Sequence, residues 1–181
     1  SAVPKTAAPD SLERHYECVT DEAALDKWLK KIEAAELTAV DTETTSLDAL
    51  AAELGGISLS VKAGEACYIP VAHRNGDTQL SRDHVLSRMK SWLESKTHLK
   101  VGQNLKYDIH VFANYGITLG GVAFDTLLES YVLESHLPHN MDSMAERHLG
   151  VKTIRYEEVC GKGAHQIGFD QVDLQVATEY A

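Results

Sequence analysis

The feature that most constrains the fold is a set of short β-rich runs in the first two thirds of the chain, separated by helical patterns. Two of them, GGISLSV and ACYIPVAH, are separated only by KAGE, and Gly64 in this spacer favours a turn, so they are expected to form a hairpin. The expected strands are HYECVT (15–20), ELTAV (36–40), GGISLSV (55–61), ACYIPVAH (66–73) and THLKVG (97–102).

Apolar residues at helical spacing predict the remaining elements. Thr20 or Asp21 can cap the first helix, Ser81 can cap the second, and Gly116 and Gly150 can end two later ones. The expected helices cover 21–36, 82–95, 104–116, 126–135, 141–150 and 170–181, and the glycine-rich segment 161–170 is expected to be a loop. Strands interleaved with helices predict an α/β fold, a mixed sheet with helices packed on it.

Length and composition are typical of one globular domain. The chain has 181 residues, of which 44% are hydrophobic and 24% charged. We expect residues 1–12 to be a linker or tail and residues 13–181 to form the domain. No apolar run approaches a membrane span and the start lacks a signal-peptide pattern, so an intracellular, cytoplasmic protein without a membrane partner is expected.

Charge and cysteines exclude some classes of site. The net charge of −10 disfavours a free-standing polyanion binder, because phosphate binding usually relies on clustered Lys and Arg. It does not disfavour a nuclease, because carboxylates that hold metal ions also count as negative charge. Cys18, Cys67 and Cys160 are far apart and lack the spacing of a zinc site, so they are expected to be reduced.

The candidate chemistry begins with two carboxylates, Asp41 and Glu43, in DTET. Residues two apart on a strand point to the same side, so both carboxylates should project together from its carboxyl end. Divalent cations would relieve their repulsion, and oxygen ligands suit Mg²⁺ or Mn²⁺ better than Zn²⁺. The alternative is a solvated strand end. Asp108 could be a third ligand or only a solvated or capping carboxylate.

Seven runs of sequence resemble the 3′→5′ exonuclease domain of bacterial DNA polymerase I, in that domain's order. They are DTETTSLD, YIPVAH, KVGQNLKYD, NYGI, AFDTLLESY, MDSMAERHLG and TIRYEEVCGKG. The resemblance begins near His15 and extends to the end of the chain. It implies a ribonuclease-H-like fold of the DnaQ-like, or DEDD, superfamily, with a mixed five-stranded sheet flanked by helices and four acids that hold two divalent metal ions, Mg²⁺ or Mn²⁺, with Zn²⁺ possible at one site.

Carried over by position, the resemblance makes Asp41, Glu43 and Asp108 metal ligands, with Asp41 bridging both ions. Tyr180 in TEYA matches the tyrosine that orients the attacking water in the tyrosine subclass. The fourth acid would then fall at position 184, so the last helix would be incomplete and this chain weakly active or inactive.

A rival assignment uses His165 and Asp170 in HQIGFD, which have the spacing of the histidine subclass. That subclass needs both side chains on one rigid helix. Gly161, Gly163 and Gly168 make this segment a poor helix, which favours Tyr180.

The resemblance also implies a grip on a nucleic-acid 3′ end. Leu47 would wedge beside the terminal base and Tyr156 would stack on it. Contacts to the substrate are further implied for Thr44, Gln103, Asn104 and Tyr107. In ESHLPHN, Pro138 and His139 replace a basic residue that is common in the family, which puts that phosphate contact in doubt.

The resulting hypothesis is a proofreading exonuclease domain that works on single-stranded or frayed DNA 3′ ends and releases nucleoside 5′-monophosphates. It would be a monomer, joined to a polymerase domain and associated with the bacterial nucleoid. Two alternatives stay open: a stand-alone exonuclease of the same superfamily that acts on RNA 3′ ends, and a catalytically silent platform for a polymerase domain.

Overall fold

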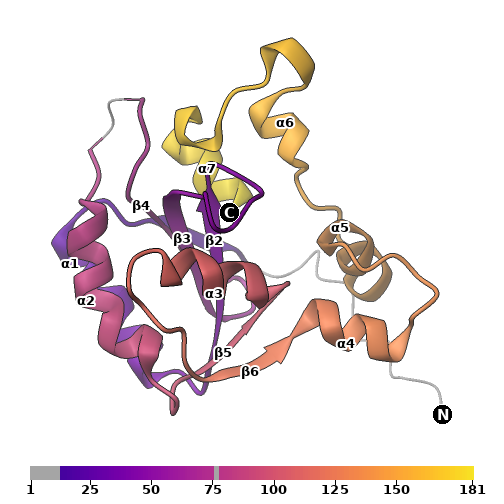
Figure 1. Cartoon of the computed structure of the whole chain (residues 1–181), viewed down its shortest axis with the longest axis horizontal. Coiled ribbons are helices and arrows are strands. Elements are labelled where there is room, and N and C mark those ends of the chain that lie inside the picture. Colours follow the sequence, from indigo (N-terminus) through magenta and orange to yellow (C-terminus); the bar gives the residue numbers. More distant parts are fainter. Residues whose placement is uncertain (1–12, 76–77) are drawn as a thin grey trace.

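The fold is built on one mixed β-sheet, seen at the centre of the computed structural model in Figure 1. The structure describes residues 13–75 and 78–181, so the linker expected over 1–12 lies outside the described residues. The described strands are β1 (His15–Cys18), β2 (Leu37–Thr44), β3 (Leu54–Lys62), β4 (Glu65–Pro70), β5 (Leu99–Gly102) and β6 (Val122–Asp125).

The sheet has the order β1-β4-β3-β2-β5-β6, so the described residues form six strands and the expectation of five is wrong. The additional strand is β6, an edge strand of four residues whose first three side chains are exposed. Such a strand carries no alternation of buried and exposed residues, the signal by which strands are recognised. Only β3 runs opposite to its neighbours, so β2, β5 and β6 have their carboxyl ends at the same edge.

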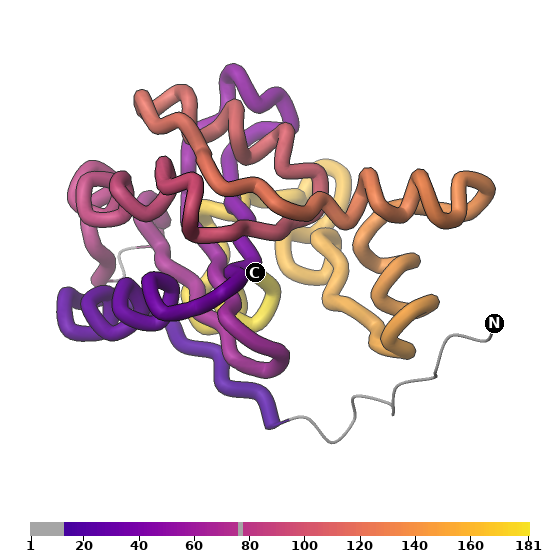
Figure 2. The backbone as a smooth tube through the Cα atoms, turned by 90° about the horizontal axis from the view of Figure 1, so that it is seen from below, coloured from indigo at the N-terminus to yellow at the C-terminus, as the bar shows by residue number. Residues whose placement is uncertain are grey.

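Helices cover both faces of this sheet. Figures 1 and 2 place α1 and α2 together on one side of the molecule and α4 and α5 on the other. The described α-helices are α1 (Glu22–Ala34), α2 (Arg82–Glu94), α3 (Leu105–Ala113), α4 (Thr126–Leu133), α5 (Met141–Met144), α6 (Tyr156–Cys160) and α7 (Leu174–Tyr180). A π-helical turn η2 (Ala145–Leu149) and two 3₁₀ turns, η3 (Gly163–His165) and η4 (Phe169–Gln171), complete the list.

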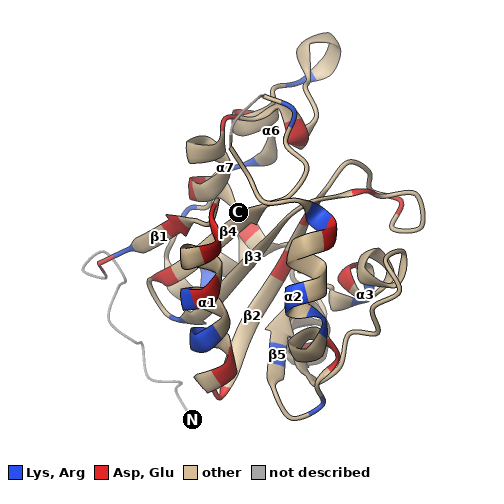
Figure 3. Cartoon of the chain, turned by 90° about the vertical axis from the view of Figure 1, so that its left-hand side faces the viewer, with Lys and Arg blue, Asp and Glu red and all other residues tan. Residues whose placement is uncertain are grey.

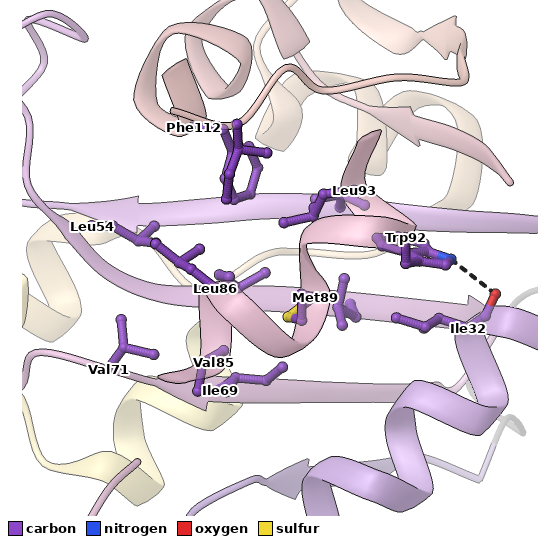
Figure 4. Close-up of a cluster of buried hydrophobic side chains, with 14 of the residues drawn as sticks. Ile32, Leu54, Ile69, Val71, Val85, Leu86, Met89, Trp92, Leu93 and Phe112 are labelled. Atoms are coloured by element: carbon purple, nitrogen blue, oxygen red, sulfur yellow. Dashed lines mark hydrogen bonds between the residues drawn. The ribbon is translucent and has the colours of Figure 1, made fainter. Parts of the chain in front are cut away.

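The main core lies between one face of the sheet and helices α1, α2 and α3. Trp28, Met89 and Phe112 are fully or almost fully buried there, one from each helix. In Figure 4, Trp92 of α2 also donates a hydrogen bond from its indole nitrogen to the carbonyl of Ile32, at 3.1 Å. This polar contact satisfies a buried indole N–H and joins α2 to the end of α1.

A smaller core lies on the opposite face of the sheet. Its buried members are Tyr68 of β4 and four residues of the C-terminal quarter, namely Cys160, Phe169, Val172 and Ala177. Tyr180 packs against this second core. The C-terminal helix therefore rests on the sheet face that the three large helices leave uncovered.

Local signals set most helix ends. Asp21 caps α1 by accepting a hydrogen bond from the amide of Ala24 at 2.8 Å, and the left-handed Gly116 and Gly150 follow α3 and η2, as expected. Helix α7 was expected from residue 170 but begins at Leu174, because the Asp173 carboxylate accepts from the first amides of the helix. The short α6 was not expected.

Lys, Arg, Asp and Glu residues recur along α1 and α2 (Figure 3). Arg88 of α2 forms ion pairs with Glu22 and Asp26 of α1. Among the helices of residues 13–75 and 78–181, each is too short or too polar to traverse a bilayer.

Candidate active site

The candidate site lies on the sheet face that α7 covers. Asp41 and Glu43 of β2 line a cavity of about 510 Å³, while Thr42 between them is buried and does not line it. Tyr180 also lines this cavity. The alternation of β2 therefore places both predicted carboxylates in one hollow, as the spacing of DTET predicted.

Burial and mutual repulsion disfavour the charged forms of these carboxylates. Burial raises the pKa of Asp41 to about 6. Burial raises the pKa of Glu43 to about 8, with further contributions from the negative charges of Asp41 and Asp108. Without a cation the site thus holds fewer charges at neutral pH than its sequence suggests.

Asp108 of α3 is buried and lies against the same strand. Its Oδ1 accepts a hydrogen bond from Thr42 Oγ1 at 2.6 Å. Burial and the charge of Asp41 raise the pKa of Asp108 to about 7, although the bond from Thr42 favours its charged form. Asp108 is therefore electrostatically coupled to the pair on β2, but it bonds to the residue that faces away from the cavity.

The donor set fits divalent metal ions in chemistry, although within the described residues no three His, Cys, Asp or Glu side chains converge on one point. The negative charge of Asp41 raises the pKa of both Glu43 and Asp108, and a cation would reverse that effect. The Ser58 hydroxyl supports this fit. Ser58 pairs in strand register with Asp41 and lines the cavity. Its hydroxyl is buried without a hydrogen-bond partner in the described part of the chain.

Tyr180 is held over the cavity by aromatic neighbours. Its ring lies 5.4 Å from that of Phe169 and 6.3 Å from that of Tyr156, measured between centroids. Burial, with the charges of Glu43 and Asp41, raises the pKa of the Tyr180 hydroxyl, which therefore stays protonated at neutral pH. A protonated hydroxyl beside two carboxylates can donate a hydrogen bond to water or substrate.

The rival pair is not brought together on a helix. His165 is exposed in η3, whereas Asp170 is buried in η4 and forms an ion pair with Arg74 at 2.7 Å. Neither side chain lines the cavity. The glycines of this segment leave only two short 3₁₀ turns.

Gln103 and Asn104 lie at the turn from β5 into α3. The Gln103 amide lines the cavity and donates to the carbonyl of His139 at 2.8 Å. Asn104 is exposed with φ 62° and ψ 46°, a left-handed conformation that asparagine tolerates. The backbone amide of Asn104 donates to the carboxylate of Asp125, which also accepts from the backbone amide of Leu105 at 2.9 Å. Asp125 was not predicted from the sequence, although an Asp before TLLES is a typical helix cap.

Thr44 and Tyr107 shape the turn that follows DTET. The Tyr107 hydroxyl donates to the carbonyl of Ser46 and also bonds to Thr44 Oγ1. Leu47 on this turn has 99% of its surface exposed, so it contributes nothing to the core. The structure thus gives Thr44 and Tyr107 a role in holding the turn that presents Leu47.

Tyr156, at the start of α6, is 39% exposed and its ring faces Tyr180. Burial of its hydroxyl, together with a smaller effect of a hydrogen bond with Cys160, raises the pKa of Tyr156 to about 12. His139, which stands in the region of the missing basic residue, stacks on Tyr131 with ring centroids 3.7 Å apart.

The sequence and fold of this chain are similar to those of known proteins. A family model described as 3′-5′ exonuclease matches residues 16–181. The chain belongs to this 3′-5′ exonuclease family.

Two curated relatives of this family member are bacterial. DNA polymerase I of Pseudomonas aeruginosa is 52% identical over 178 residues, which cover 96% of this chain and 20% of that protein. DNA polymerase I of Rhizobium leguminosarum is 40% identical over 186 residues, covering 92% and 18%. The chain therefore spans about a fifth of the length of the curated relatives it matches.

Among solved structures, Escherichia coli RNase D, an exoribonuclease involved in structured RNA processing, superposes with a TM-score of 0.59 at 21% identity. The match covers 79% of this chain and 36% of that one. Its fold is the ribonuclease-H-like fold that the sequence resemblance implied.

Proposed function

We propose that this family member is the proofreading domain of a bacterial DNA polymerase I and removes nucleotides from DNA 3′ ends. The observation that carries the proposal is the cavity shared by Asp41, Glu43 and Tyr180, with Asp108 buried against the same strand. These four side chains supply carboxylate oxygens and one protonated hydroxyl, the groups that metal-assisted hydrolysis of a phosphodiester requires.

Asp41, Glu43 and Asp108 would hold two divalent ions, with Mg²⁺ or Mn²⁺ favoured by the all-oxygen ligands. When bound, these ions polarise the phosphodiester and lower the pKa of water. Tyr180 positions the attacking water by donating a hydrogen bond. A carboxylate four positions after Tyr180 completes the ligand set in this proposal.

The DNA end reaches this cavity as a single strand, because a paired terminus must fray before its last phosphodiester can enter a hollow. Leu47, Tyr156, Gln103 and Asn104 then contact the terminal nucleotides. The rest of the parent chain, with its polymerase domain, supplies further grip, which accords with the net charge of −10. We further propose a monomer at the bacterial nucleoid.

Leu47→Ala is expected to weaken binding of a single-stranded DNA 3′ end roughly three- to tenfold, because burial of a leucine side chain against a base contributes on the order of 1 kcal/mol. The melting temperature should stay unchanged, since Leu47 is exposed. Fluorescence anisotropy with a labelled oligonucleotide measures the first effect, and thermal unfolding the second. Unchanged DNA affinity would remove Leu47 from the substrate site.

The proposed function is tested by digestion of matched single-stranded DNA and RNA in the presence of Mn²⁺. The test uses residues 1–181 and a longer form that continues through an acidic residue at position 184. We expect the longer form to degrade DNA at least about a hundredfold faster, because a ligand of the metal site is restored. Equal rates in both forms would refute the role of Tyr180 and the fourth acid.

RNA digestion that exceeds DNA digestion would favour the alternative, an RNA 3′ exonuclease, for which the likeness to an exoribonuclease fold is the specific observation. No digestion by the longer form would favour the silent platform. Tyr180→Phe in the longer form removes only one hydroxyl, so its rate tests the role of Tyr180 separately from that of the fourth acid.

A further inference from the structure

A second contact network lies behind the candidate site, where the loop after β4 meets the segment before α7. Residues His73, Arg74 and Asn75, which we call the 73–75 clamp, hold residues 170–172. The backbone amide of Arg74 donates to the carbonyl of Asp170 at 2.7 Å, and its side-chain Nε lies 2.7 Å from Asp170 Oδ2.

The other two clamp residues converge on one carbonyl. His73 Nδ1 lies 3.0 Å from the oxygen of Val172, and Asn75 Nδ2 donates to the same oxygen at 3.2 Å. Because a carbonyl can only accept, Nδ1 of His73 is the donor. His73 Nε2 lies 2.7 Å from the hydroxyl of Tyr68, so the clamp is itself fixed to β4.

Phe169 contacts both the clamp and the candidate site. This residue shares η4 with Asp170 and is 2% exposed. Its ring contacts those of His73 and Tyr180, at centroid distances of 5.8 and 5.4 Å. Helix α7 starts only four residues after Asp170, so the position of η4 sets the position of Tyr180.

The ion pair between Arg74 and Asp170 is the contact of the clamp that fixes the position of η4. The Asp170 side chain is 8% exposed and the Arg74 side chain 70% exposed. A buried carboxylate that loses its cation must find another partner or become solvated, and solvation requires η4 to move away from the sheet. Gly168 permits the present arrangement, since a Cβ there would lie 2.3 Å from Asp170 Oδ1.

We propose that Arg74 and Asp170 are positioning residues that hold Tyr180 over the carboxylates through η4 and Phe169. Asp170, which resembles a metal ligand in sequence, acts here through its ion pair. The kinetic consequence rests on the proposed function, whereas the effect on α7 does not.

Hydrogen exchange of residues 1–181 tests the positioning directly. The backbone amides of Ala177 and Ala181 donate to the carbonyls of Asp173 and Ala177, at 2.8 and 2.9 Å, in the first and last turns of α7. In Arg74→Gln we expect these two amides to exchange roughly tenfold faster, while the exchange of the α2 amides is unchanged. Asp170→Asn should act alike, and the double variant should be no worse than either single one. Arg88→Gln, which breaks two ion pairs between α1 and α2, is the control and should leave α7 unchanged.

Equal acceleration in α2 and α7 would show that the ion pair contributes only to global stability, and additive effects in the double variant would show that the two residues act separately. Either result overturns the proposal. The exchange result stands without any catalysis, so a failure of the proposed function is distinguishable from a failure of the clamp.

A kinetic measurement extends the test in the longer form of the chain. Arg74→Gln should lower kcat roughly ten- to hundredfold with little change in KM, because Tyr180 is misplaced while the substrate contacts remain. Arg74→Lys, which retains the charge, should recover part of kcat. A loss that appears only in KM would contradict a positioning role.

Discussion

Asp41→Asn is expected to lower the exonuclease kcat by at least about a thousandfold and, at the same time, to stabilise the metal-free protein at pH 8. The activity falls because one of the residues that would hold the metal ions loses its charge. The stability rises because burial holds the pKa of Asp41 at about 6, so the native state of the wild type carries an unfavourable ionised group at pH 8. A substitution that lowers activity but raises stability is characteristic of a functional carboxylate.

Single-turnover digestion of single-stranded DNA in the longer form measures the first effect, and urea unfolding in EDTA measures the second. Glu33→Gln, an exposed change on α1, is the control for the loss of one negative charge. A destabilised Asp41→Asn protein would indicate that Asp41 is a structural residue.

The second large effect is a loss of stability on raising the pH from 5 to 8 in EDTA. Asp41, Glu43 and Asp108 have folded-state pKa values of about 6, 8 and 7, all above their ordinary values. Well below about pH 4 the carboxyls are protonated in both states and no penalty exists. As the pH rises, the unfolded state releases its protons first, so the native state is progressively disfavoured until the folded-state pKa values are passed.

We expect this loss to amount to several kcal/mol and to appear as a melting temperature that falls by roughly 10 °C or more. Mn²⁺ at pH 8 should restore the stability, because bound cations favour the ionised carboxylates. The decisive comparison is with Asp41→Asn/Glu43→Gln, whose profile in EDTA should be flatter. Identical profiles for this variant and the wild type would exclude Asp41 and Glu43 as the cause.

The sequence alone was sufficient for the parts of the site that depend on local geometry. Strand periodicity places Asp41 and Glu43 on one face, and the order of the family motifs adds Asp108 and Tyr180. The same local signals offered Thr20 or Asp21 as the cap of α1, of which the structure uses Asp21, and predicted the helix ends at Gly116 and Gly150. The common face of Asp41 and Glu43 and the helix ends depend on residues within one strand or one turn, whereas the roles of Asp108 and Tyr180 rest on the family resemblance and stay predictions.

Contacts between distant segments were decided only by the tertiary structure. Nothing near Asp108 in the sequence indicates that its carboxylate bonds to Thr42, 66 residues away, or that Asp170 pairs with Arg74. The edge strand β6 escaped prediction because a strand of four mostly exposed residues has no periodic signal. Periodicity and capping are properties of neighbouring residues, whereas the pairing of buried polar groups depends on which segments the fold brings together.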